Sequence, residues 1–137
     1  MATHGEPAIT LVRPPWKLKG TVYSFFLYSG KQAISTLEQQ KSLLYPPLEL
    51  ESKFADGELL GGAGSVQVIR YTESPVGPYD EILLVPGAYG YDIEDTQTDG
   101  SVKITKKKGP RITRIYVSQK YTCWNGRTSK YNLWLVY

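Results

Sequence analysis

The sequence predicts a mainly β domain, in which an antiparallel sheet is strongly curved or closed and little helix is present. Hydrophobic and charged residues make up 41% and 21% of the 137 residues, as in ordinary soluble domains. Eleven tyrosines against three phenylalanines suit half-buried β surfaces, where a ring packs inward and its hydroxyl finds a partner. Short alternating apolar segments recur between clusters of Gly, Pro and Ser, which is typical of strands joined by turns.

The first half of the chain predicts one strand, one helix and one glycine-rich turn. Residues 21–28, "TVYSFFLY", form the strand, and the two prolines of the preceding "RPPW" keep that segment from being helical. Residues 34–44 are the helical candidate, because Ile34, Leu37 and Leu44 recur at roughly helical spacing. The segment "GELLGGAGS" lacks the lysine of a phosphate-binding loop, so we interpret it as a turn that enters the next strand.

Four further strands follow. Residues 64–72 alternate, with Val66, Val68 and Arg70 on one face and Gln67, Ile69 and Tyr71 on the other. Residues 81–85, "EILLV", form a solid apolar run that is typical of a strand covered on both sides. Residues 111–119 predict another strand, and residues 101–105 a short one.

The segment "ESPVGPYDE" predicts a rigid corner that positions two acids. Pro75 and Pro78 fix φ, and Gly77 can take a positive φ, so the chain turns tightly before Asp80. If side chains then alternate, Glu81 lies on the same face as Leu83, beside apolar walls that would raise the pKa of its carboxyl group. The alternative is that both acids are ordinary solvated residues at the end of a turn.

Charge and reactive residues exclude several functions. The basic run "KITKKKGPR" follows acidic "DIEDTQTDG", and we interpret it as a solvated hairpin or loop in preference to a nucleic-acid strip or a nuclear address. His4 is the lone histidine and Cys123 the lone cysteine, so the sequence lacks the residues that a histidine-based triad or a tetrahedral zinc site requires. The sequence shows neither a signal peptide nor an apolar run long enough to span a bilayer. We therefore predict a soluble cytoplasmic protein without a metal, a membrane or a nucleic-acid partner.

Three segments resemble the acetoacetate decarboxylase-like family, most closely its filamentous-fungal branch. They are "PPWKLKGTVYSFFLY", "GGAGSVQVIRYTESPVGPYDEILLVPGAY" and "RITRIYVSQKYTCWNGR", and they are long, ordered and collinear. The resemblance covers residues 13–127, roughly the first half of a family member. It implies an antiparallel cone-shaped β-barrel around a small apolar cavity that binds a β-keto acid, with no cofactor. It also allows a homo-oligomer.

The resemblance implies the chemistry and one site residue. In acetoacetate decarboxylase a lysine activated by desolvation or a neighbouring cation forms a Schiff base with the substrate ketone, and carbon dioxide then leaves. The acid of the family motif "GPYxE" corresponds to Glu81, which would line the pocket and orient the substrate. We also predict that Tyr79 and Arg70 contact the substrate.

The resemblance stops where the family's Schiff-base lysine is expected. An ungapped alignment from Asn125 places Trp134 at the lysine position, and Lys130 lies four positions too early without a preceding proline. Codons for Ser129-Lys130-Tyr131 can spell GTAAGT, an intron boundary, so we hypothesise that residues 129–137 are intron-derived and that the family match is truncated. The expected organisation is a flexible N-terminus at 1–12, a barrel domain at 13–128 and a divergent tail at 129–137.

Two functional classes follow. In the first, the family product is a carbon-carbon lyase acting on a β-keto acid, or uses the same imine for aldol condensation or dehydration, whereas this chain without the lysine is inactive. In the second, the chain is a non-catalytic barrel that holds a small apolar carbonyl compound. Borohydride trapping separates the two, because only an imine becomes a stable adduct.

Overall fold

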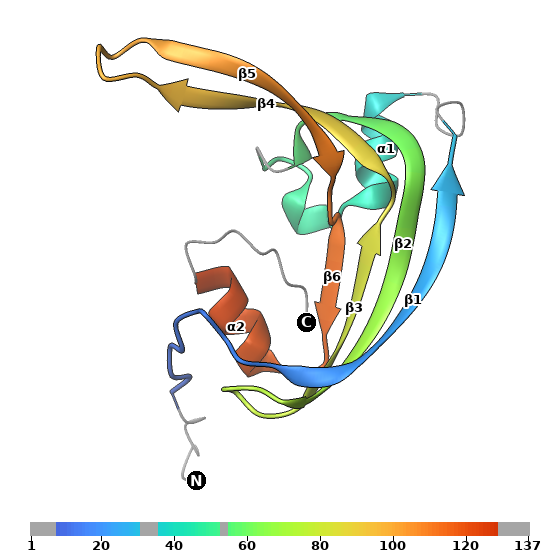
Figure 1. Cartoon of the computed structure of the whole chain (residues 1–137), viewed down its shortest axis with the longest axis vertical. Helices are drawn as coiled ribbons and strands as arrows, with labels where there is room; N and C mark the ends of the chain where they lie inside the picture. Colours follow the sequence, from blue (N-terminus) through green and yellow to red (C-terminus); the bar gives the residue numbers. More distant parts are fainter. Residues whose placement is uncertain (1–7, 31–35, 53–54, 129–137) are drawn as a thin grey trace, which may run out of the picture.

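The computed structural model describes residues 8–30, 36–52 and 55–128. In these ranges the chain forms an antiparallel six-stranded sheet with two α-helices and a short 3-10 helix (Figure 1). The elements are β1 (Lys19–Ser29), α1 (Leu37–Leu44), the 3-10 helix η1 (Pro47–Glu49), β2 (Glu58–Glu73), β3 (Tyr79–Val85), β4 (Ala88–Thr96), β5 (Val102–Pro110), β6 (Arg114–Val117) and α2 (Lys120–Thr128). The prediction of a mainly β antiparallel domain is confirmed.

β2 is the long central strand that gives the sheet its curvature. Its first residues, from Glu58 to Gly61, pair with β4, and residues 65–71 pair with β3. The change of partner occurs at Gly61 and Gly62, whose φ angles of 78° and 96° favour glycine. A Cβ at Gly61 would lie 2.6 Å from the carbonyl oxygen of Ser29. The prediction that this segment is a turn before the strand was wrong, because the glycines bend the strand from within.

The corner between β2 and β3 is confirmed. The Gly77 amide donates to the Ser74 carbonyl over 3.1 Å, and Gly77 has a φ of 91°. The turn brings β3 back beside β2 in a register that pairs Tyr71 with Tyr79. The orientation of the β3 side chains is therefore set at the corner, as the sequence predicted.

The remaining predicted elements agree in part with the structure. The predicted strands at 21–28, 64–72 and 81–85 lie within observed strands, and the one at 101–105 lies within β5 except for its first residue, Ser101. The predicted strand at 111–119 is shorter, Arg114–Val117, and is followed by the unpredicted helix α2. Ile34 of the predicted helix lies outside the described residues, and α1 begins after Thr36, whose hydroxyl caps it by accepting from the Gln39 amide.

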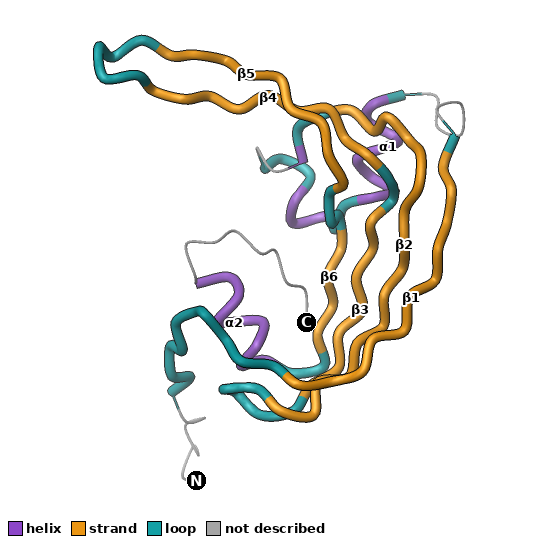
Figure 2. Tube along the Cα trace, in the orientation of Figure 1, coloured by secondary structure: helices purple, strands orange, loops and turns teal. Residues whose placement is uncertain are grey.

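The predicted solvated hairpin is also confirmed, although its second strand is longer than the short strand expected at 101–105. The acidic segment that precedes the basic run is β4, which the sequence analysis did not predict, and the basic run is β5. Asp92 pairs with Lys106 and Asp95 with Lys103 across the ladder. These opposite charges stabilise the register of a hairpin that extends away from the rest of the molecule (Figure 2).

The main core lies on the concave face of the sheet. Its buried residues are Ile69, Tyr79, Leu83, Ile115, Val117 and Cys123. On the opposite face, Ile82 and Val68 are 43% and 38% exposed. The prediction that the apolar run at 81–85 is covered on both sides was therefore wrong, because among the described residues only the concave face is packed.

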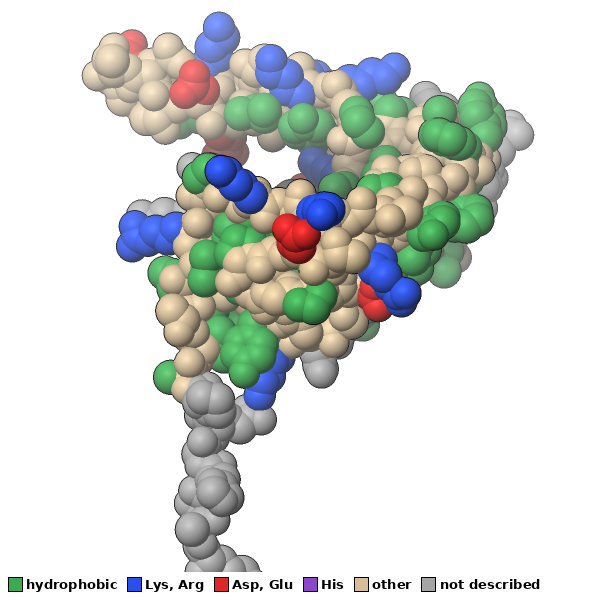
Figure 3. Space-filling view, turned by 60° about the horizontal axis from the view of Figure 1, so that its bottom comes forward, with side chains coloured by type: hydrophobic (Ala, Val, Ile, Leu, Met, Phe, Trp, Pro, Cys, Tyr) green, Lys and Arg blue, Asp and Glu red, His purple; other side chains and the backbone are tan. Residues whose placement is uncertain are grey.

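The sheet does not close on itself in the part of the chain that the structure describes. There β1 pairs with β2 alone and β6 with β3 alone, so each strand has a free edge. Large hydrophobic side chains of β1 are exposed, including Phe26 at 88% and Tyr28 at 82%. Figure 3 shows such side chains along its right-hand edge, the side on which β1 lies in Figure 1.

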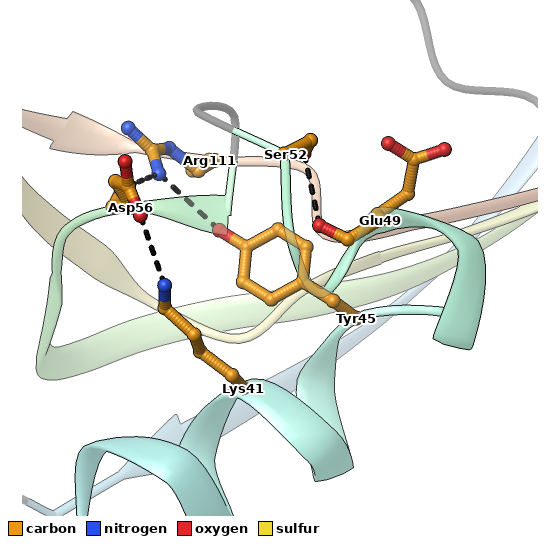
Figure 4. A network of polar contacts seen from close by, with 6 residues as sticks. All are labelled: Lys41, Tyr45, Glu49, Ser52, Asp56 and Arg111. Carbon is orange, nitrogen blue, oxygen red and sulfur yellow. Dashed lines mark hydrogen bonds and ion pairs between the residues drawn. The ribbon is translucent and has the colours of Figure 1, made fainter.

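A second, smaller core joins α1 to the base of the β4–β5 hairpin. Its buried residues are Tyr45, Ala55, Leu59 and Tyr89. The Arg111 guanidinium lies 5.2 Å from the ring centre of Tyr89. It also donates to the Tyr45 hydroxyl and to the Asp56 carbonyl (Figure 4). The Asp56 carboxylate accepts from Lys41 of α1 over 2.9 Å. Arg111, the last residue of the basic run, therefore has a structural role here.

Candidate functional site

The concave face holds a pocket of about 360 Å³. Most of its wall is apolar, and the sheet, α2 and the N-terminal segment each contribute a side. The lining residues are Val12, Pro14, Trp16, Leu18, Tyr71, Tyr79, Glu81, Leu83, Ile112, Ile115, Thr122, Asn125 and Gly126. Its volume lies at the small end of the range found for small-molecule sites.

The N-terminal segment is held against α2 by one buried side chain. Asn125 is 1% exposed, and its Oδ1 accepts from the Val12 amide over 2.7 Å. Its Nδ2 donates to the carbonyls of Thr10 and Tyr121 over 3.2 and 2.9 Å. The Trp16 indole in turn donates to the Val12 carbonyl over 2.9 Å. Thr10 and Val12 fall in the stretch expected to be flexible, yet both bond to Asn125 of α2, and Val12 forms part of the pocket wall.

Glu81 is the acidic residue of the pocket. On the sheet it pairs with Ile69 of β2 and Val117 of β6, so its side chain lies on the concave face, as the alternation predicted. Burial raises the pKa of the Glu81 carboxyl group above its ordinary value. Burial also raises the pKa of the Tyr79 hydroxyl, and the nearby Glu81 charge adds to the shift. The rings of Tyr79 and Tyr71 lie 4.6 Å apart and form one end of the wall.

Burial shifts the Glu81 carboxyl group toward its neutral form, compared with a solvated glutamate. A protonated glutamic acid can donate a hydrogen bond to a carbonyl oxygen, whereas the ionised form repels an anion. Among the described residues, no lysine lines this pocket. The described walls can therefore bind and polarise a carbonyl compound but supply no amine for an imine.

The structure brings two of the three predicted site residues together. Tyr79 lines the pocket beside Glu81. Arg70 lies on the opposite face, where its Nε donates to the Asp80 carboxylate over 2.9 Å. The reason is the period of the strand, since Arg70 and Asp80 are paired one position away from Ile69 and Glu81. Asp80 is thus a surface residue, as the alternative interpretation of the turn expected.

Sequence reasoning missed the walls that come from outside the sheet. The strand pattern gave no sign that Trp16, Thr122 or Asn125 would meet Glu81. The only signal was the composition of "RPPW", a non-helical segment whose prolines and tryptophan favour packing against another part of the protein. Long-range contacts such as Val12 with Asn125 are set by tertiary packing and have no local sequence pattern.

A second groove lies between α1 and the β4–β5 hairpin and carries both signs of charge. Asp56, Glu58, Asp92 and Glu94 line it together with Lys106, Lys107 and Arg111. Mixed charges weigh against a phosphate-binding strip. In the described part of the chain no group of three or more His, Cys, Asp or Glu side chains is arranged to hold a metal, and no helix has the length and apolarity to cross a membrane.

Comparison with known proteins found no relative. No family model or curated protein matches the sequence, and no solved structure matches the fold.

Proposed function

We propose that the Glu81 pocket binds a small, mainly apolar carbonyl compound of the β-keto acid class, and that the chain is related to acetoacetate decarboxylase-like proteins. The observation that carries the proposal is the position of Glu81, a half-buried carboxyl group with a raised pKa in a mainly apolar pocket. The curved sheet is compatible with the cone-shaped barrel that the resemblance implies, because further strands could join the free edges of β1 and β6. Buried Cys123 suits a reducing cytoplasm.

The chemistry of the pocket determines how binding depends on pH. A neutral Glu81 donates a hydrogen bond to a ligand carbonyl, and the apolar walls contact the rest of the ligand. An ionised Glu81 opposes the carboxylate of a β-keto acid in a site of low dielectric constant. Binding of a keto acid is therefore expected to strengthen as the pH falls through the raised pKa of Glu81.

The test is a titration of the full chain with acetoacetate and with acetylacetone, an uncharged β-diketone, followed by NMR at about pH 5.5 and about pH 8. Both ligands are expected to saturate, and acetoacetate is expected to bind more tightly at the lower pH. Glu81→Gln, which stays neutral and keeps a donor, is expected to remove that difference. If neither ligand saturates, or if the wild-type affinity for acetoacetate does not change with pH, the proposal fails.

A second candidate function is the carbon-carbon lyase itself. The match of Glu81 and Tyr79 to the family motif "GPYxE" supports the lyase. The binding function is favoured by the pocket lining, which contains no lysine among the described residues. Incubation with acetoacetate and borohydride, followed by mass spectrometry, separates the two. We expect no reduced adduct. A reduced lysine adduct whose formation is blocked by acetylacetone would make the lyase the better account.

A further inference from the structure

One wall of the pocket is an extended segment that belongs to no strand or helix. Residues 8–18 precede β1, and Figure 1 shows this N-terminal segment, in blue, beside α2. Alternate side chains of the segment line the pocket, namely those of Val12, Pro14, Trp16 and Leu18. The side chains between them are exposed. Pro14 and Pro15 have no amide donor, so this stretch cannot pair continuously as an edge strand. The segment therefore covers the pocket without being part of the sheet.

Few bonds hold the N-terminal segment in place. In the described part of the chain, the hydrogen bonds that join residues 8–18 to other elements all involve Asn125 of α2. The bond from the Trp16 indole to the Val12 carbonyl lies within the segment. None of the half-buried apolar residues that pack against the main core belongs to the segment; they are Tyr71, Val85 and Ile112. Because so few contacts hold it, the segment can open locally at a lower free energy than the sheet can unfold.

A ligand in the pocket would lie between the N-terminal segment and the sheet. Glu81 and Leu83 belong to β3, whereas Val12 and Trp16 line the pocket from the segment. The pocket has a volume of only about 360 Å³, so a compound that fills it contacts both walls. With the segment released, one side of the same compound would be exposed to water, and its apolar contact there would be lost. The ligand therefore has a higher affinity for the closed form of the segment than for the open form.

We propose that the N-terminal segment is a movable wall of the pocket, and that its attachment to α2 is coupled to ligand binding. Asn125 holds the segment closed, which completes the pocket, and a bound ligand keeps the segment closed in return. This inference rests on the proposed function, and it makes Asn125 a positioning residue that acts through the segment. A ligand that binds the closed form alone lowers the open fraction about tenfold when its concentration is about ten times its Kd.

Hydrogen exchange of the full chain, followed by NMR at about pH 5.5 with and without acetylacetone, tests the coupling. At about ten times the measured Kd, exchange of the Val12 amide is expected to slow about tenfold. The reason is that this amide donates to Asn125 over 2.7 Å in the closed form. The control is the Ser101 amide, which donates to the Asp99 carboxylate over 2.9 Å on the hairpin that extends away from the pocket. Its exchange rate is expected to stay the same.

The Thr113 amide is the reference for unfolding of the whole protein. It donates to the Leu84 carbonyl over 2.9 Å, and Thr113 is 5% exposed. Without ligand, the Val12 amide is expected to exchange faster than the Thr113 amide. Equal rates would show that the segment opens only when the whole protein unfolds, and would overturn the inference.

Asn125→Ala gives an independent readout. The variant is expected to bind acetylacetone about tenfold more weakly, since most of its molecules are open before binding. Without ligand, the Trp16 indole signal of the variant is expected to move away from its wild-type position, and saturating acetylacetone is expected to return it. A variant that had only lost a ligand contact would show no such movement. Thr128→Ala, near the exposed end of α2, is the control and is expected to keep the wild-type affinity.

The outcomes separate this inference from the proposed function. If acetylacetone binds the wild type but leaves exchange of the Val12 amide unchanged, the coupling is wrong and the proposed function stands. Unchanged acetylacetone affinity in Asn125→Ala would likewise overturn the role of Asn125 alone. If the wild type does not bind acetylacetone at all, the proposed function fails together with this inference.

Discussion

Glu81 of β3 lies directly opposite Ile69 of β2, which places a carboxyl group on the buried face of the sheet next to a core residue that is 5% exposed. The pairing is a consequence of the rigid corner at Gly77, which sets the register of β3 against β2. Had the register shifted by one residue, Asp80 and Ile82 would face the core and Glu81 would face solvent. The chemistry of the pocket therefore depends on the geometry of one turn.

The pH dependence of stability should report the burial of Glu81. Below the ordinary pKa of a glutamate both the folded and the unfolded chain hold this proton. As the pH rises the unfolded chain loses it first, so the free energy of unfolding falls until the pH passes the raised pKa in the folded state. Urea unfolding at about pH 4 and about pH 8 is expected to show a smaller loss in Glu81→Gln than in the wild type.

The matched control for this prediction is Glu94→Gln, on the exposed hairpin. It is expected to keep the wild-type loss of stability between the two pH values. An equal loss in Glu81→Gln and the wild type would show that Glu81 titrates as an ordinary solvated residue.

Leu83 and Ile82 are neighbours on β3 that should respond differently to truncation. Leu83 is 7% exposed in the main core, so Leu83→Ala is expected to lower the free energy of unfolding by about 2–5 kcal/mol. Ile82 is 43% exposed on the other face, and Ile82→Ala is expected to cost about 1 kcal/mol or less. Urea unfolding measures both. Equal losses would show that both faces of β3 are packed, as the apolar run first suggested.

Asn125→Ala should detach the N-terminal segment from α2. The change removes three side-chain hydrogen bonds and leaves the half-buried Val12 amide without its partner, so we expect a loss of about 2–4 kcal/mol in the free energy of unfolding. Hydrogen exchange at the Val12 amide is expected to accelerate. The control is Thr128→Ala near the exposed end of α2, for which exchange at Val12 is expected to stay slow. If hydrogen exchange at the Val12 amide were unchanged in Asn125→Ala, Asn125 would not be the residue that holds the N-terminal segment against α2.

The exposed aromatic side chains of β1 predict self-association. Phe26 is 88% exposed on a strand with a free edge among the described residues, a combination that favours edge-to-edge contacts. Phe26→Lys is expected to raise the concentration at which the chain associates, as measured by sedimentation velocity. Val102→Lys adds the same charge to an exposed position on β5 and serves as the control. A wild-type chain that stays monomeric at high concentration would contradict the prediction.

Local sequence patterns predicted the strands well and the elements between them poorly. The alternation at 64–72 and the turn residues Pro75 and Gly77 act within a few positions, so strand faces and the corner could be inferred. The bend at Gly61 could not, because a glycine within a strand and a glycine in a turn look alike in sequence. Helix α2 was missed because "KYTCWNGRT" has weak helix formers and no clear apolar stripe.

The candidate site was predictable only where it lies on the sheet. Glu81 and Tyr79 follow from the period of β3, whereas Arg70 was assigned to the pocket although the same period places it on the other face. Thr122 and Asn125 could not be inferred, since burial on α2 arises from contacts with residues more than 100 positions away in the sequence, such as Val12. Pocket walls assembled from distant segments require the tertiary structure.

The central claim is that the concave pocket is a binding site for a small carbonyl compound, and methyl NMR tests it most directly. Acetylacetone is titrated into the full chain while the methyl signals of Leu83, Ile112 and Ile115 in the pocket are compared with those of Ile82 and Leu84 on the other face. Saturable shifts confined to the pocket methyl groups are the predicted result. Shifts that do not saturate, or that are equally large on the outer face, would contradict the account.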